Sequence, residues 1–202
     1  MGTVFDGIML ALYPVIVFFG LTYLNVRWTA LLLIVLLGRR FIAAIFASKE
    51  TSVPVIIQIA ATGGLIGGAG ISNSEIFLRF TPFLISLVFF AQFAFSLRST
   101  PIIERFARLQ RPDLPPDHVK YCGALTKVWL LVFAGNSALV LAAAFVESKG
   151  LWAILVGPVS YAYLGTFLAS EYVFRKRRFG DYNPKNPIDR MIRAIFKNRI
   201  PE

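Results

Sequence analysis

The chain has 202 residues, of which 56% are hydrophobic and only 16% are charged, and its formal net charge is +10. A soluble domain of this length has roughly a quarter of its residues charged, and a chain with a mean hydropathy of +0.66 would expose large apolar patches to water. The composition therefore excludes an ordinary water-soluble domain and indicates that lipid surrounds most of the surface.

The apolar stretches predict an all-α integral membrane bundle of about six transmembrane helices. The predicted helices cover residues 7–24, 28–47, 54–71, 76–97, 122–146 and 151–174. A span needs about 20 residues, so the second helix has to continue through Gly38, Arg39 and Arg40, because its clean apolar part ends at Leu37. The alternative is five spans, in which the first or the second helix fails to cross. Asp6 stands where a cleaved signal peptide has basic residues, so we expect the first helix to be retained.

The longest polar interval, residues 98–121, lies between the fourth and fifth predicted helices. Thr100 and Pro101 form a favourable helix start, with a hydroxyl N-cap followed by proline. The next residues divide into an apolar face (Ile102, Ile103, Phe106 and Leu109) and a polar face (Glu104, Arg105, Arg108 and Arg111). This pattern predicts a short amphipathic helix on the lipid headgroups. Three prolines then predict an extended link to the fifth span: Pro112, Pro115 and Pro116.

The C-terminal tail is basic and carries a second amphipathic pattern. It begins with four basic residues, 175–178, and ends with an apolar stripe formed by Ile188, Met191, Ile192 and Ile195. A basic amphipathic helix beside a membrane span is typical of binding to anionic lipid, and the tail contains no recognisable nucleic-acid-binding module. We therefore divide the chain into a transmembrane bundle, residues 1–174 with the cytoplasmic loop 98–121, and a basic cytoplasmic tail, residues 175–202.

The basic residues also predict the orientation. They gather in the loop between the second and third helices, in the loop 98–121 and in the tail, whereas the opposite loops hold only Arg27, Arg79 and Lys149. With six spans, the three basic regions lie on one side of the membrane. The positive-inside rule places that side, and with it both termini, in the cytoplasm.

Six polar residues on five predicted helices are expected at a similar depth near the cytoplasmic ends, given a rise of about 1.5 Å per residue. They are Arg39, Arg40, Gln58, Gln92, Lys127 and Glu171. One interpretation is a cytoplasm-facing pocket, whose cations bind an anionic headgroup, an acyl phosphate or a carboxylate, while the glutamines orient the ligand and the glutamate balances the charge. The alternative, which we favour, is that the cations extend to lipid phosphates and that Glu171 pairs with a nearby arginine.

Asn136 lies near the middle of the fifth predicted span, where its side chain cannot reach the headgroups. We expect it to be a structural polar residue that hydrogen-bonds another helix.

Four glycines of the third helix form two overlapping G-x-x-x-G pairs, which predict close helix packing. They are Gly63, Gly64, Gly67 and Gly68.

The single cysteine and the single histidine restrict the possible chemistry. Cys122 alone excludes an internal disulfide and a multi-cysteine metal site, and His118 alone cannot form a histidine-rich site. The two would share a helix face only if the fifth helix began early, and no third group that would orient a nucleophile and its base is apparent. We therefore expect no catalytic residue, no metal and no cofactor, and we disfavour an enzyme.

Residues 100–140 resemble a bacterial inner-membrane family that is related to the intracellular septation protein A family. The resemblance rests on the P-x-x-E-R-F-A-R helix from Pro101, the D-L-P-P link, the Tyr121–Cys122 pair, the T-x-V-W run and Asn136. YPVIVFFGL in the first helix adds to it, as does the sixth helix from Trp152 to Arg175, whereas the glycine-heavy third helix and the long basic tail depart from the pattern. The resemblance implies a multi-span protein of a bacterial inner membrane, in a family whose motifs carry no known chemistry.

Two functions follow as expectations. The septation-related proteins are linked to cell division and envelope maintenance, which implies a non-catalytic scaffold or envelope-maintenance protein that recruits partners through its basic cytoplasmic face. Closer relatives accompany genes for fatty-acid-like or aryl-polyene synthesis. They imply the alternative, an accessory or transfer protein for acyl or polyene lipid intermediates that works with acyl carrier protein-dependent synthesis. The expected partners are membrane lipids with anionic headgroups and an acidic protein at the cytoplasmic face, and no nucleic acid.

Overall fold

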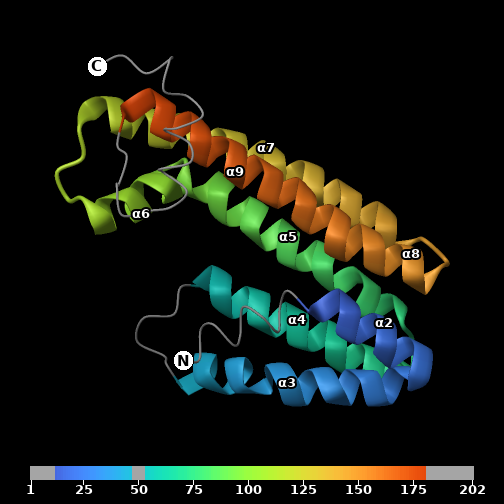
Figure 1. Ribbon diagram of the computed structural model, residues 1–202. Helices are drawn as coiled ribbons and strands as arrows, with labels where there is room; N and C mark the ends of the chain where they lie inside the picture. The colour runs from blue at the N-terminus through green and yellow to red at the C-terminus, as the bar shows by residue number, and fades with distance from the viewer. Residues whose placement is uncertain (1–11, 47–52, 181–202) are drawn as a thin grey trace, which may run out of the picture. The chain divides into compact units, whose positions relative to one another are not determined.

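The computed structural model describes residues 12–46 and 53–180, and every regular element in this part of the chain is helical. Figure 1 shows the elements in order along the chain. They are α2 (Tyr13–Tyr23), α3 (Val26–Phe46), α4 (Val53–Ser72), α5 (Ile76–Ser96), α6 (Ile102–Gln110), α7 (Pro116–Ala144), α8 (Lys149–Ile154), the π-helical turn η1 (Leu155–Val159) and α9 (Ser160–Phe179). The chain forms two compact units, Met1–Tyr161 and Ala162–Glu202, with the boundary inside α9.

Among the described helices, three are long and apolar enough to cross a bilayer. They are α5 with 21 residues, α7 with 29 and the uninterrupted run Lys149–Phe179 with 31, against the roughly 20 residues that a span needs. Shorter apolar helices are α2 and the segment Val26–Leu36 of α3. Large apolar side chains such as Phe95 and Leu131 are exposed on the helices, as expected where lipid is the solvent. The predicted all-α fold with helices of membrane-spanning length is confirmed, and the number of six spans stays a prediction.

Several predicted helix boundaries agree with the structure. α3 is one continuous helix to Phe46, so it passes through Gly38, Arg39 and Arg40 as the length requirement predicted. α4 and α5 begin and end close to the predicted third and fourth helices, and α6 is the predicted short helix after Pro101.

The predicted start of the fifth helix at residue 122 is wrong, because α7 begins at Pro116. Pro115 has an extended backbone, with φ −58° and ψ 150°, and Pro116 then occupies the first helical position. The missing N–H of proline costs nothing there, since that position has no intrahelical acceptor. Asp117 follows in the first turn, where a negative charge favours the helix dipole. The extended link is therefore shorter than predicted.

The last described helix runs beyond the predicted end at residue 174. α9 continues to Phe179, so the basic cluster at residues 175–178 is helical. Basic side chains in a last turn complement the partial negative charge of a helix C-terminus. The predicted amphipathic helix with Ile188 and Ile195 lies outside the described residues.

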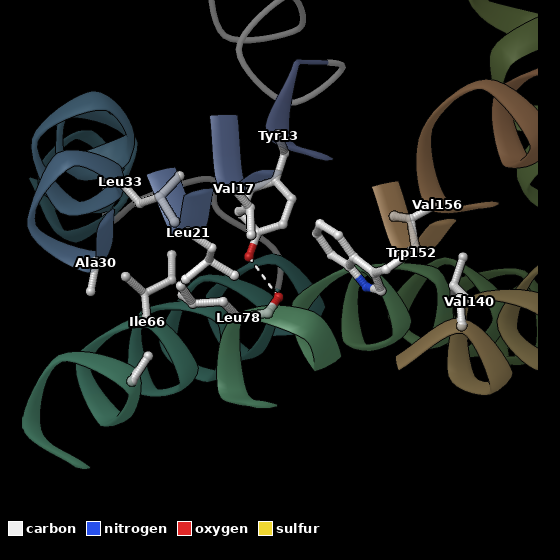
Figure 2. Packing of buried hydrophobic residues seen from close by; sticks show 12 residues of the cluster. Tyr13, Val17, Leu21, Ala30, Leu33, Ile66, Leu78, Val140, Trp152 and Val156 are labelled. Atoms are coloured by element: carbon white, nitrogen blue, oxygen red, sulfur yellow. Dashed lines mark hydrogen bonds between the residues drawn. The ribbon is translucent and has the colours of Figure 1, made fainter. Parts of the chain in front are cut away.

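The core of the first unit is built around α2, with buried residues from α3, α4, α5, α7, α8 and η1 packed beside it (Figure 2). Tyr13 is buried, and its hydroxyl donates to the backbone carbonyl of Leu78 at 2.9 Å. Val17 and Leu21 follow Tyr13 at spacings of four residues, which places one face of α2 in the core. Trp152 of α8 is fully buried beside them. α5 in turn packs along α7 and α4, and α4 packs along α3.

The glycines of α4 only partly fulfil the packing prediction. A Cβ added at Gly64 or Gly67 would meet nothing within 4 Å among the described residues, so in this part of the chain the predicted close packing is wrong at these two positions. Gly68 lies against the ring of Phe77, with a nearest distance of 3.6 Å from its ideal Cβ. The ideal Cβ of Gly70 would lie 3.5 Å from Cβ of Ala30. Because α4 is apolar all round, the spacing of its glycines does not identify the face that packs.

Candidate functional site

Three of the six residues of the predicted cytoplasm-facing pocket have side chains outside the described part of the structure. Arg39 and Arg40 lie in the second half of α3, and Gln58 lies in the first half of α4. Their helical positions agree with the prediction. The contacts of their side chains stay a prediction.

The side chains of the other three pocket residues are described, two in the first unit and one in the second. Gln92 of α5 is half-buried and Lys127 of α7 is exposed, and neither side chain has a hydrogen bond or ion pair with another described residue. Glu171 belongs to the second unit, where its Oε1 pairs with Nε of Arg175 at 3.1 Å. This ion pair is the one that the alternative interpretation expects.

Four buried polar side chains, which we call the mid-helix network, meet halfway along α5. Asn136 of α7 donates through Nδ2 to Oγ of Ser86 on α5 at 3.1 Å, and its Oδ1 accepts from the hydroxyl of Ser160 at 2.6 Å. The hydroxyl of Ser137 contacts that of Ser86 at 2.9 Å. All four residues are at most 8% exposed. Asn136 thus joins three helices, which is the structural role predicted from its depth.

The mid-helix network lies beside η1, where Pro158 interrupts the ordinary α-helical bonding. Proline has no N–H and cannot bond to the carbonyl four residues before it. In a π turn each bond reaches one residue further, and the N–H of Ser160 accordingly bonds to the carbonyl of Leu155. The hydroxyl of Ser160 then meets Asn136. Sequence reasoning missed this turn, although Pro158 within an apolar helix was its visible signal.

A second cluster, which we call the charged clasp, consists of Glu75, Arg79 and Lys149. Arg79 lies in the first turn of α5 and is only 5% exposed. Its Nη2 pairs with Oε1 of Glu75 at 2.7 Å. The other carboxylate oxygen of Glu75 pairs with Nζ of Lys149 at 3.3 Å. One carboxylate is therefore shared by two cations from different elements.

The charged clasp also binds backbone carbonyls of a loop and of a helix end. Arg79 donates to the carbonyls of Val146 and Glu147, in the loop between α7 and α8. Lys149 donates to the carbonyl of Leu21, in the last turn of α2, at 2.9 Å. A helix C-terminus has carbonyls without intrahelical partners and about half a negative charge. Two cations thus bind one carboxylate, one helix end and two loop carbonyls, which indicates a structural role.

Sequence reasoning treated Arg79 and Lys149 as isolated cations on the less basic side. The signal that could have paired one of them was the i, i+4 spacing of Glu75 and Arg79 at a predicted helix start. The contacts with α2, α7 and Lys149 are tertiary and leave no local signal.

Side-chain bonds fix α6 to the chain on either side of it. Arg105 donates to the carbonyl of Thr100 at 2.9 Å and to the hydroxyl of Ser99 at 3.0 Å. Arg108 pairs with Glu104 at 2.8 Å and donates to the carbonyl of Pro112 at 3.2 Å. The P-x-x-E-R-F-A-R motif thus has a structural explanation, because its charged residues hold the helix and its two flanking turns in place.

The two faces of α6 differ from the prediction at one residue. Glu104, which was placed on the polar face, is buried, and α6 packs against α7. Phe106 and Leu109 of the apolar face are 59% and 80% exposed, and Arg108 and Arg111 are exposed as well. The exposed surface of α6 is therefore both apolar and basic.

The early start of α7 places His118 and Cys122 one turn apart on the same helix. Cys122 is buried, and its carbonyl accepts from the hydroxyl of Thr126 at 2.8 Å. A reactive thiol needs exposure and a positive environment, so burial favours a structural cysteine. In the described part of the chain, no group of three or more histidine, cysteine, aspartate or glutamate side chains could hold a metal ion.

Comparison of the chain with protein-family models, with curated proteins and with solved structures finds no match.

Proposed function

We propose that the protein spans a bacterial inner membrane six times, with both termini in the cytoplasm, and has a non-catalytic role in scaffolding or maintaining the cell envelope. In this role its basic cytoplasmic face binds anionic lipid headgroups. The observation that carries the proposal is the exposed apolar and basic surface of α6. Because α6 lies between the end of α5 and the start of α7, crossing of the bilayer by these two helices puts α6 at the membrane surface.

The chemistry of the exposed side chains suits an anionic lipid surface. Phe106 and Leu109 gain free energy when they enter the acyl boundary, and Arg108 and Arg111 beside them meet the phosphates. Each basic residue near an anionic membrane surface contributes about 1 kcal/mol. The bonds of Arg105 and Arg108 to their flanking turns support a fixed binding surface in place of a flexible linker.

The resemblance to septation-related proteins supports the envelope role and the bacterial inner membrane. The acyl-lipid transfer function rests on the resemblance and on the predicted pocket of six residues, and it stays a prediction.

Native mass spectrometry of the full chain, extracted from bacterial membranes in mild detergent, tests the proposal. We expect the protein to retain phosphatidylglycerol and cardiolipin in excess over their share of the membrane. The double variant Phe106→Ser, Leu109→Ser should lose this excess, because the helix no longer has its acyl contacts. Retention of one specific acyl intermediate would instead favour the transfer function.

A matched pair of variants separates charge from folding. Arg111 and Asp113 are both exposed in the same link. Arg111→Gln should lower the retention of anionic lipid, whereas Asp113→Asn should not. Lipid in the proportions of the bulk membrane, unchanged by all of these variants, would contradict the proposed surface. Deletion of the protein should alter cell length or detergent sensitivity, and the wild-type chain should restore both.

A further inference from the structure

The mid-helix network carries more donor hydrogens than its own contacts use. Each serine hydroxyl supplies one donor, and the carboxamide of Asn136 supplies two. The contacts use one hydrogen of Asn136, the hydroxyl hydrogen of Ser160 and one of the two hydroxyl hydrogens of the Ser86–Ser137 pair. One amide hydrogen and one hydroxyl hydrogen therefore have no acceptor among the described residues.

Other buried hydroxyls of the same unit satisfy themselves on their own helix. The hydroxyl of Thr126 donates to the carbonyl of Cys122 at 2.8 Å, and that of Thr81 donates to the carbonyl of Phe77 at 3.2 Å. In the described structure, Ser86 and Ser137 form no such bond, because their hydroxyls point between helices toward one another. The spare donors of the network are thus a specific feature of this place.

We infer that the mid-helix network binds a water molecule beside η1. A spare donor inside a membrane-spanning bundle is costly, and a buried water typically makes about three hydrogen bonds to otherwise unsatisfied polar groups. The water accepts the spare amide hydrogen of Asn136 and the spare serine hydrogen, and it donates to a remaining lone pair of Ser160 or of the network. Ordered water is one of the groups that satisfy the backbone around a proline in membrane helices, together with π turns, and Pro158 lies in such a turn here.

Trp152 supplies a matched comparison within the same unit. Its Nε1 is buried and has no hydrogen-bond partner among the described residues. The residue lies in the apolar cluster with Val17 and Val156 (Figure 2). A buried water needs two to four polar partners, so a lone indole N–H in this cluster stays dry. We therefore expect water at the spare amide hydrogen of Asn136, which has polar neighbours, and no water at the indole N–H of Trp152, which has apolar ones.

Nuclear magnetic resonance of the full chain in deuterated detergent, with ¹⁵N in the asparagine and tryptophan side chains, tests the inference. We expect a nuclear Overhauser cross-peak between water and the side-chain amide of Asn136, and none for the indole of Trp152. The signals of Asn136 are assigned by their disappearance in Asn136→Leu. Absence of a water cross-peak at Asn136 in the wild-type chain would overturn the inference.

Two variants test whether the network holds the water. Ser86→Ala combined with Ser137→Ala removes the hydroxyl pair, and the water cross-peak of Asn136 should be lost while circular dichroism shows unchanged helix content. Ser72→Ala is the control, because the hydroxyl of Ser72 is exposed and donates to its own helix at Gly68. Persistence of the cross-peak in the folded double variant would also overturn the assignment. If the double variant does not fold, the presence or absence of the Asn136 water cross-peak in the wild-type spectrum tests the inference by itself.

Discussion

At the scale of single residues, we expect Arg79 to contribute most of the stability that the charged clasp gives to the first unit. Arg79→Met leaves the carbonyls of Val146 and Glu147 without their donor and leaves Glu75 with Lys149 alone. Removing one partner of a buried charged pair costs about 3–5 kcal/mol. The side chain of Glu75 is 35% exposed and water can solvate it, so we expect a smaller loss of about 2–3 kcal/mol in the free energy of unfolding.

Unfolding of the purified protein in detergent, followed by circular dichroism, measures this loss. Arg27→Met is the control, because Arg27 is exposed and lies on the same predicted side of the membrane. The control should stay within about 0.5 kcal/mol of wild type. Equal small losses for both variants would show that the clasp does not stabilise the fold.

Gly20 shows a steric constraint at the same scale. An added Cβ would lie 2.5 Å from Cγ2 of Thr29. Thr29 cannot move aside, because it is fully buried, has a branched Cβ and donates to the carbonyl of Asn25 at 2.9 Å. We expect Gly20→Ala to lower the free energy of unfolding by about 1–3 kcal/mol. Gly64→Ala, which meets open space, should instead be neutral or stabilise by up to about 1 kcal/mol. The reverse order of the two variants in thermal unfolding would contradict this account.

At the scale of helices, span length was predictable where it had only one solution. The length that a span requires predicted that α3 continues through Arg39 and Arg40, and α3 is one helix to Phe46. The start of α7 was not predictable, since Pro115 and Pro116 are equally compatible with a helix break and a helix start. The packing of α6 on α7 favours the start, and no local pattern displays that packing.

The candidate sites also contain features that the sequence predicts and features that it does not. The role of Asn136 was predictable, because a polar side chain at that depth needs a partner on another helix. Its partners were not predictable, since η1 shifts the register of the helix that carries Ser160. The charged clasp was missed because its contacts join α5 to α2, to α8 and to the loop before α8, and sequence spacing reports only the Glu75–Arg79 pair at the start of α5.

The mid-helix network gives a prediction about how helices are held together. Asn136→Leu removes the bonds to Ser86 and Ser160. Hydrogen bonds between membrane helices contribute about 0.6 kcal/mol on average and up to about 1.7, so we expect a loss of about 1–2 kcal/mol. Asn136→Asp keeps the shape but buries a charge, at a cost of about 2.5–3.5 kcal/mol. Unfolding in detergent should rank wild type above Asn136→Leu and Asn136→Leu above Asn136→Asp. Gln92→Leu, which removes no side-chain bond, should be neutral, and a neutral Asn136→Leu would show that the network does not stabilise the bundle.

At the scale of the whole molecule, the two predicted sides differ in the number of basic residues near the ends of the predicted spans. Arg79 and Lys149, on the less basic side, both pair with Glu75. Arg111 and Lys120, on the basic side, are exposed. The positive-inside rule concerns basic residues near the ends of the spans that remain on the cytoplasmic side. The greater number of basic residues on the side of Arg111 and Lys120 therefore predicts that this side is cytoplasmic.

The contacts of α2 also bear on whether the chain has six or five spans. Lys149 of the charged clasp binds the last turn of α2. The turn at Asn25, which follows α2, therefore lies on the same side of the first unit as the charged clasp. With six spans, the N-terminus is cytoplasmic and Asn25 lies on the outer side. If the first helix does not cross, the N-terminus and Asn25 both lie on the outer side. If the second helix does not cross, the N-terminus lies on the outer side and Asn25 lies on the cytoplasmic side. The bond from Lys149 to Leu21 favours the arrangements with Asn25 outside.

Reporter fusions and labelling of introduced cysteines measure these positions. Fusions after Glu50, Arg111 and Glu202 should all report the cytoplasm, because every arrangement in which the last four helices cross keeps them on one side. A cysteine at Asn25, in a Cys122→Ser background, should react with an impermeant reagent from the outer side, and an N-terminal reporter should be cytoplasmic. Disagreement among the three fusions would reject the orientation itself. An outer N-terminus would reject six spans and leave five, because only then do the first two helices make a single crossing between them.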